Sequence, residues 1–374
     1  MASSCALSRS RERMETLFQS SADGHALRVE ALEELRLTLG FSAFVWPLAD
    51  PETATGVAPL AELHSARDLP LLIKGKYAST VNRWTALSLA ATPVGTLRSS
   101  TAGGAAGAGG LWEDMLRGQG VGDVASVVHA DQYGIWSWLD LWRDAGDAPF
   151  SESETAFLAS LAPAMTRGLR RSCARQFQAG AVPAKPAPPQ ADLVVDEDMG
   201  VLGQTASAGA WLSLLQRAPG PYSGIPAEVF NVVGQLLAKE ARVDHHAAAA
   251  RVHIGSGRWA ALRAARMDRP WSAGHDAATP QAPAIAVTIQ ECLPAARLGV
   301  FVRAYGLTPR ERQALALLAA GLENEALAGR MGIAGYTVQD HFKAIFAKTG
   351  MRSRAGVLAL ALGGSAADDA AYGG

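Results

Sequence analysis

Long apolar segments and clustered cysteines are both absent from this sequence of 374 residues. No run of about eighteen apolar residues without charge occurs, so the sequence predicts no membrane-spanning helix. Cys5, Cys173 and Cys292 lie far apart and lack metal-ligand spacing, which fits reduced thiols rather than disulfides. The first residues are polar and charged, unlike a secretion signal. Together these absences predict a cytoplasmic protein.

Motifs of several enzyme classes are absent too. The sequence contains no Gly-x-Ser-x-Gly, His-Glu-x-x-His or Gly-x-Gly-x-x-Gly pattern. The glycine-rich residues 101–110 lack the Gly-Lys-Ser/Thr of a phosphate-binding loop, and their low complexity favours a mobile loop. We therefore expect no catalytic residues and no enzyme activity.

Histidines offer the only candidates for metal or haem ligation. One patch contains Asp244, His245, His246 and His253. Adjacent histidines point in different directions and no further cluster completes a ligand set, so the pattern argues against a metal site. His64 and His129 each stand alone among apolar residues, where an ordinary core or surface histidine is favoured over a haem ligand. No metal or cofactor is predicted.

The strongest local signals lie between Gly306 and Arg354. Thr308, Pro309 and Glu311 form a capping box with proline at the first helical position, so a helix is expected to begin there. Gly321 supplies a stop. Between these signals, apolar residues recur at helical spacing: Leu315, Leu318, Ala319 and Leu322.

Two more short helices are expected after Gly321. They should span about residues 323–331 and 336–348, separated by a tight turn between Gly332 and Gly335. Three short helices with a glycine turn before the third form a helix-turn-helix, whose last helix enters the DNA major groove. The side chains expected to face inward are Ala326, Leu327, Met331, Val338, Phe342, Ile345 and Phe346.

This stretch resembles the LuxR/GerE-type DNA-binding domain of bacterial transcription regulators. The family usually has Ser at the position of Ala334, where a hydroxyl caps the third helix, and often at that of Glu323. The third helix is therefore expected to fray at its start or to be capped by Thr337. The matching residues are 307–312, 320–322, Asn324, Glu325, Thr337, Val338, His341, Lys348, Ser353 and Arg354.

The third helix provides candidate DNA contacts. Of its outward residues, Lys343 could donate to guanine, Gln339 could pair with adenine and Asp340 could accept from cytosine. The resemblance supports these three as base-facing positions, and Tyr336 on the same face is also expected to read bases; the alternative is a merely solvated helix face. Contacts to backbone phosphates are expected from Arg310, Thr337, His341, Lys348 and Arg354.

Charge and the last helix agree with DNA binding. Residues 303–362 contain eight basic and four acidic residues, whereas the remainder contains 26 and 31. A basic end fits a phosphate-binding surface, although the excess is small. Residues 353–362 should form a fourth, leucine-rich helix, which in this family pairs two subunits. A homodimer on double-stranded DNA is the expected assembly.

The first 175 residues show helices around an antiparallel sheet. After a polar segment we expect a helix at residues 24–40, a strand at 41–48 ending at Pro47, and a helix within 60–80. Two strands, 123–129 and 134–142, precede a helix from about 149 to 171.

The second of these strands contains three tryptophans. Trp136, Trp138 and Trp142 alternate onto one face with Asp140 between them. The order of elements over residues 24–175 resembles a GAF-type sensor domain, a class that often binds a small molecule on one sheet face. The tryptophans are therefore either core or the lining of a ligand pocket.

Proline density in residues 176–191 predicts an extended linker. Beyond it we expect strands at 192–196 and 201–204, helices at 208–216 and 226–240, and strands at 251–254, 258–267 and 284–292. This order resembles a PAS-type domain. A helix at 294–305 should then connect it to the DNA-binding stretch, with Ala295, Leu298, Val302 and Tyr305 on one side.

The predicted fold class is multidomain, with two α+β sensor domains, each an antiparallel sheet with flanking helices, and a C-terminal all-α four-helix helix-turn-helix domain. The predicted function is a cytoplasmic, nucleoid-associated transcription regulator gated by a signal, a partner or a small-molecule effector. The alternative is a sensor or adaptor that acts through protein contacts and binds DNA weakly. The parts are a GAF-like domain at 1–175, a linker at 176–191, a PAS-like domain at 192–293, a connecting helix at 294–305, a LuxR-type domain at 306–365 and a disordered tail at 366–374.

Overall fold

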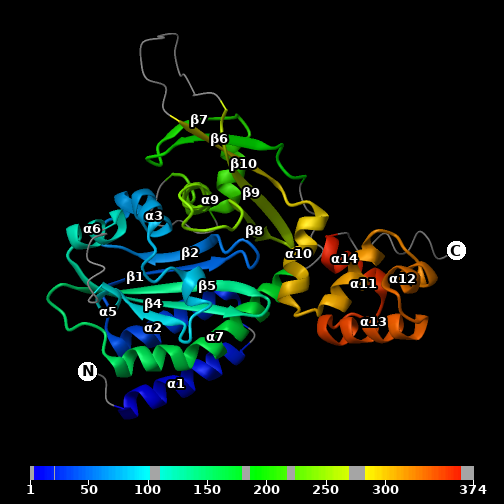
Figure 1. Cartoon of the computed structure of the whole chain (residues 1–374), viewed down its shortest axis with the longest axis horizontal. Coiled ribbons are helices and arrows are strands. Elements are labelled where there is room, and N and C mark those ends of the chain that lie inside the picture. The colour runs from blue at the N-terminus through cyan, green and yellow to red at the C-terminus, as the bar shows by residue number, and fades with distance from the viewer. Residues whose placement is uncertain are drawn as a thin grey trace, which may run out of the picture.

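The computed structural model describes residues 4–20, 22–101, 110–178, 186–216, 224–268 and 283–363. It contains two five-stranded antiparallel sheets and a helical C-terminal region at one end (Figure 1). Most of the expected loop at 101–110, half of the expected linker and the expected tail lie outside the described residues.

The first unit, residues 4–178, is built on a sheet with the order β2-β1-β5-β4-β3. Helices α1, α2 and α7 lie along one side of this sheet, and α3 and α6 lie on the other (Figure 1). The strands are Ala43–Ala49 (β1), Gly56–Glu62 (β2), Val94–Thr96 (β3), Val121–Asp131 (β4) and Gly134–Asp144 (β5). The helices are Ser4–Gln19 (α1), Gly24–Leu39 (α2), Leu69–Ala78 (α3), Trp84–Leu87 (α4), Leu97–Thr101 (α5), Leu111–Gly118 (α6) and Glu152–Gln178 (α7).

Two expectations about the first unit were wrong in detail, those for its opening segment and for the end of its first strand. The opening segment is the helix α1, because Met14 and Phe18 are one helical turn apart and both are buried. The helix expected within residues 60–80 is present as α3, and the first residues of that range belong to β2. The strand β1 continues past Pro47, since its register with β2 shifts between Trp46 and Leu48 and tolerates the missing amide.

The second unit, residues 186–291, has the sheet order β7-β6-β10-β9-β8. In both units the fifth strand lies between the first and the fourth, so the two sheets share one topology. Helix α9 lies between the two sheets (Figure 1). Every expected element is present: Ala191–Asp196 (β6), Val201–Gln204 (β7), Ala208–Leu215 (α8), Ala227–Glu240 (α9), Ala249–Gly255 (β8), Arg258–Arg266 (β9) and Ala284–Glu291 (β10).

The C-terminal region consists of α10 and the helix-turn-helix domain. Its helices are Pro294–Ala304 (α10), Pro309–Ala319 (α11), Asn324–Met331 (α12), Gly335–Thr349 (α13) and Arg354–Leu362 (α14). Two residues that were expected on the inner faces of these helices, Ala295 and Ala326, are exposed. Helix α10 instead buries Val300, Phe301 and Val302 in succession, since it packs on α7 along one side and on α14 along another.

The apolar cores cross the expected domain boundaries. One cluster runs from the first unit through Phe177 and Phe301 into the helix-turn-helix domain. A second joins the first unit to the second, with Tyr77 and Trp138 on one side and Val229 and Val233 on the other. The sheet units are therefore packed together rather than separated by a spacer.

Candidate functional site

The start of α11 is held by two connected side chains. Thr308 Oγ1 accepts a hydrogen bond from the Glu311 amide at 3.3 Å, and Glu311 Oε2 accepts one from the Thr308 amide at 2.8 Å. Lys348 Nζ donates to the same Glu311 oxygen at 2.7 Å and to the Gly306 carbonyl at 3.0 Å. The capping box is thus confirmed, and Lys348, expected at a phosphate, is engaged within the domain and ties α13 to α11.

The turn before α13 follows the expected glycine pattern but lacks a side-chain cap. Gly332 adopts a left-handed conformation with φ 65° and ends α12. Ala334 occupies the N-cap position of α13 in extended conformation and makes no side-chain cap bond. The Thr337 amide donates only to the Ala334 carbonyl, at 3.0 Å. Within the described residues no side chain, that of Thr337 included, caps this helix start.

Helix α13 separates an apolar face from a polar one. Val338, Phe342 and Ile345 are buried, and Phe346 is half-buried against the same core. The four residues expected to read bases are all exposed: Tyr336, Gln339, Asp340 and Lys343.

Asp340 and Lys343 pair with each other on this exposed face. Lys343 Nζ lies 2.9 Å from Asp340 Oδ1, and the two side chains are 74% and 62% exposed. Such an exposed pair is worth little, so either side chain can exchange its partner for a base edge.

The other expected phosphate-contacting residues are arranged unequally. Arg310 is exposed and donates to the Gln313 side chain at 3.0 Å, while Thr337 and His341 are half-buried. Arg354 bonds Asn324, and its guanidinium lies 4.1 Å from the centre of the Phe342 ring. Burial lowers the pKa of Arg354.

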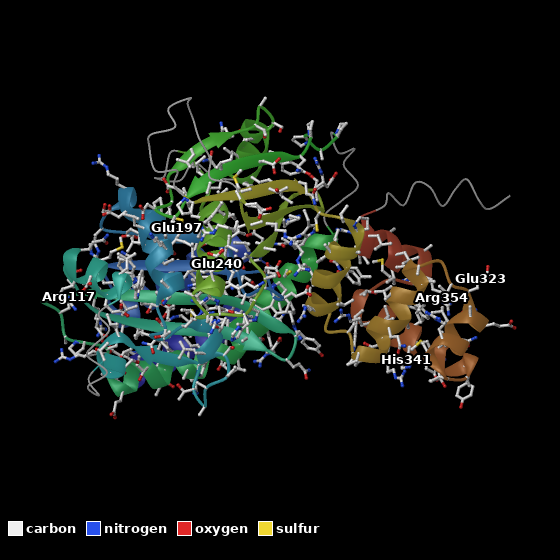
Figure 2. All side chains as sticks on the ribbon, turned by 45° about the horizontal axis from the view of Figure 1, so that its top comes forward. Arg117, Glu197, Glu240, Glu323, His341 and Arg354 are labelled. Atoms are coloured by element: carbon white, nitrogen blue, oxygen red, sulfur yellow. The ribbon has the colours of Figure 1, made fainter. Side chains whose placement is uncertain are left out.

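Figure 2 shows His341 and Arg354 on the helix-turn-helix domain, at the end of the molecule opposite Arg117. Arg330 and Arg352 are also exposed on this domain and were not among the expected contacts. Their signal was present, because both contribute to the basic excess of the C-terminal region.

Helix α14, expected to pair two subunits, makes contacts within the chain. Val357 and Ala361 are buried, and Arg297 of α10 donates to the Leu360 carbonyl at 2.8 Å. Arg297 is itself buried over the Phe177 ring, at 4.9 Å from its centre. The α10 helix therefore covers part of α14.

A short helix pair, a glycine turn and a third helix with an exposed polar face define a DNA-binding domain of the helix-turn-helix class. Residues 306–361 match the family model described as bacterial regulatory proteins, luxR family. The C-terminal domain is therefore of the LuxR type, which supports a DNA-binding transcription regulator. No curated protein matches the chain. Among the described residues, no helix is both long and apolar enough to cross a membrane.

A second candidate site lies between the two sheet units. A cavity of about 1330 Å³ is lined by residues of β1, β2, β5, α3 and the end of α7, and by residues of α8, α9 and β8. Trp138 and Trp142 line it, and Trp138 stacks on Trp84 with ring centres 4.1 Å apart. The tryptophans are buried, so two of them serve both the core and the cavity wall.

An ion pair lies against the β5 side of the cavity. Lys76 Nζ is 2.9 Å from Asp140 Oδ2, and these side chains are 8% and 1% exposed. Ser126 Oγ donates to Asp140 at 2.6 Å. The carboxylate between the tryptophans is therefore already neutralised.

The described histidines have different partners. His129 is fully buried with Nδ1 2.7 Å from Ser137 Oγ, and burial lowers its pKa to about 3. His64 Nε2 lies 3.1 Å from Asp144. In the part of the chain that the structure describes, no three His, Cys, Asp or Glu side chains are placed to hold a metal ion.

Asp244, from the histidine-rich patch, belongs to the interface between the units. Its Oδ2 lies 2.8 Å from Arg83 Nη2, and both side chains are 3% exposed. Asp50 of the first unit likewise accepts from the Arg251 amide at 2.8 Å and from its Nε at 2.7 Å. Sequence reasoning missed both pairs because their members are far apart in the chain.

Proposed function

We propose that this protein is a sequence-specific DNA-binding transcription regulator whose DNA binding is gated by a signal sensed in a GAF-like and a PAS-like unit. The observation that carries the proposal is the LuxR-type match over residues 306–361 together with the exposed polar face of α13. Within that face, Gln339, Asp340 and Lys343 read bases and Tyr336 lies beside them. Arg310, Thr337, His341 and Arg354 contact phosphates.

The two sheet units supply the gate. Their shared strand order and the cavity between them support a sensory role, because such an interface is a common place for a small-molecule site. Helix α10 packs on α7 of the first unit and on α14 of the DNA-binding domain, so a change in the units reaches the domain directly.

The regulator acts as a homodimer on an inverted-repeat site. Because α10 covers part of α14, release of this contact would expose the surface that pairs two subunits. Sedimentation of the full chain with and without operator DNA measures the assembly; a monomer bound to a half-site would refute the dimer.

DNA affinity measured against salt tests the proposal. A regulator that neutralises several phosphates loses affinity steeply as salt rises, and it prefers promoter fragments over random duplex. A flat salt dependence with no sequence preference would leave the alternative, an adaptor that acts through protein contacts.

The Lys343→Ala variant tests base reading. It should cost about 1 to 3 kcal/mol at one base pair and relax the preference there. Lys239→Ala removes the same charge from an exposed position at the end of α9 and serves as the control. An equal loss on all sequences would assign Lys343 to phosphate binding instead.

A further inference from the structure

One end of the cavity contains an arginine that is buried without an acidic partner. Arg28 of α2 is 2% exposed and lines the cavity. Its Nε donates to the Gly24 carbonyl at 2.9 Å, and its Nη1 donates to the carbonyls of Trp46 at 2.6 Å and Ala58 at 2.9 Å. Among the described residues, no carboxylate forms an ion pair with it and no acceptor bonds its Nη2.

A second arginine lies at the same end. Arg175, near the end of α7, lines the cavity, and α7 approaches the start of α2 closely there. A Cβ added at Gly24 would lie 3.0 Å from Ser172 Oγ. Among the described residues, Asp23 is the carboxylate whose charge acts on both arginines, and it caps α2 by accepting from the amides of His25 and Ala26. Two guanidinium groups thus share one carboxylate, which leaves an excess of positive charge.

We propose that this cavity binds an organic anion with an aromatic body, whose negative group lies between Arg28 and Arg175. The ligand-binding site stands on its own geometry, whereas its regulatory meaning rests on the function proposed above. An anionic group would give Arg28 the counter-charge that it lacks, and buried charges are stabilised by such pairing.

The rest of the cavity selects the body of the ligand. The lining includes the rings of Tyr77, Trp112, Trp138 and Trp142, and most of its other residues are aliphatic. The volume of about 1330 Å³ exceeds the range of roughly 300–1,000 Å³ usual for small-molecule sites, so a multi-ring ligand fits.

The acidic groups of the cavity do not favour a cationic ligand. Asp140 is paired with Lys76, as described above. Glu228 accepts from the Ala58 amide at 2.8 Å, and its burial raises its pKa, which favours the neutral carboxyl. Burial lowers the pKa of Arg28 only to about 9, so this group is charged at neutral pH.

The anion site adjoins the contact between α7 and α10. Arg175 faces the cavity, while the Ala174 carbonyl accepts from Tyr305 Oη at 3.0 Å and Phe177 packs on Phe301. A ligand that draws Arg175 toward Arg28 therefore acts on the same turns of α7 that hold α10.

The experiment compares two fluorescent probes on the full-length protein. 8-Anilinonaphthalene-1-sulfonate carries an anionic group on aromatic rings, and N-phenyl-1-naphthylamine has the same rings without the charge. Each is titrated in the absence of DNA while tryptophan quenching is followed. We expect saturable binding of the anion at one site per chain, at least about tenfold tighter than the neutral amine, which corresponds to about 1.4 kcal/mol.

Single substitutions test which arginines supply the positive charge that binds the anionic probe. Arg175→Gln should weaken binding of the anion by about tenfold and leave that of the neutral probe within about twofold, because the substitution removes the positive charge and keeps a polar side chain. Arg167→Gln removes an exposed charge from α7 that does not line the cavity, and it should change neither probe. Arg28→Met should act like Arg175→Gln; if that variant does not fold, the comparison of Arg175 with Arg167 decides.

Three outcomes would overturn the proposal: equal affinity for both probes, equal effects of the Arg175 and Arg167 variants, or unsaturable binding. Because no DNA is present, none of these outcomes bears on DNA recognition. A flat salt dependence of DNA affinity would in turn leave the anion site intact.

Discussion

The two interfaces of this molecule are built from different interactions. Between the sheet units, Asp244 pairs with Arg83 and Asp50 with Arg251, in each case through buried carboxylates. At α10 the contact with α7 is mainly aromatic, with Phe301 packing on Phe177. The polar bonds around α10 end on backbone carbonyls: those of Ala174 in α7, Tyr133 between β4 and β5, Leu360 in α14 and Ala296 in α10 itself.

This difference suggests where movement is possible. Buried ion pairs fix one geometry, since separating them leaves an uncompensated charge in a dry interior. Apolar contact is non-directional, and a single hydrogen bond contributes about 0.5 to 1.5 kcal/mol. We expect the sheet units to respond as one body and the α10 contact to be the place that shifts.

The Asp244→Ala substitution tests the fixed interface and should have the largest effect. It leaves the Arg83 guanidinium buried without an acidic partner, so the free energy of unfolding should fall by about 3 to 5 kcal/mol. Urea denaturation of the full chain measures it. Asp198→Ala, which removes a largely exposed partner of Lys74, should have a much smaller effect. Equal losses would mean that the interface is not fixed by its ion pairs.

Acid should weaken the same interface. Burial opposes ionisation of Asp244 and Asp50, but hydrogen bonds and charge from His246, Arg83 and Arg251 outweigh it and hold the pKa of both carboxyls below the ordinary value. The unfolded chain then binds more protons, so stability present above about pH 4 is lost as pH falls further.

The expected slope is up to about 1.4 kcal/mol per pH unit for each carboxyl. Burial of neutral His129, with its pKa near 3, adds loss in the same direction from about pH 6.5 downward. Urea midpoints between pH 7 and 3 measure the sum. The Asp244→Asn substitution should make the urea midpoint fall less steeply below pH 4. The Asp147→Asn substitution, at an exposed position, should leave that slope unchanged.

The Ala334→Ser substitution tests whether the DNA-binding domain unfolds independently of the two sheet units. A hydroxyl at this N-cap should stabilise α13 by about 0.5 to 2 kcal/mol. If the α10 contact is the weaker link, thermal scans should show only the transition of this domain rising. Ala347→Ser, on the exposed side of the same helix, should lower it slightly. A uniform shift of one transition would indicate that the whole chain unfolds together.

The smallest effect on stability is expected from Tyr305→Phe. It removes the bond to the Ala174 carbonyl and keeps the ring packed on Phe301, so about 0.5 to 1.5 kcal/mol should be lost. The substitution should affect signalling more than stability: the anionic probe should change the DNA affinity of this variant less than that of the unsubstituted protein. Tyr133→Phe is the matched control, because its hydroxyl has no hydrogen-bond partner within the described residues. An unchanged response would place the coupling elsewhere.

The helix-turn-helix domain could be predicted because its signals are local. Thr308 and Glu311 cap a helix three residues apart, and Gly321 and Gly332 end helices directly. The wrong expectation for Ala326 also comes from a local signal. Helical spacing shows on which face of a helix a residue lies, but not whether a residue at the edge of that face is buried. The base-facing role of Lys343 stays a prediction.

The interface and the cavity could not be predicted, because their residues meet only in three dimensions. Arg83 and Asp244 are 161 positions apart, and Asp50 and Arg251 are 201 apart. The sequence showed Trp138 and Trp142 on one strand face, yet α9 supplies the opposite wall. The helix α1 was missed because its two buried apolar side chains, Met14 and Phe18, stand among charged residues.

Only a short segment of helix α7 separates the proposed anion site from the contact with α10. Arg175 and Phe177 are two positions apart on one continuous helix, a rise of about 3 Å. Because a hydrogen-bonded helical turn is stiff over that length, no chain of intermediate residues is needed between input and output. A displacement of one would move the other almost equally, so ligand shape rather than a relay would determine the strength of the response.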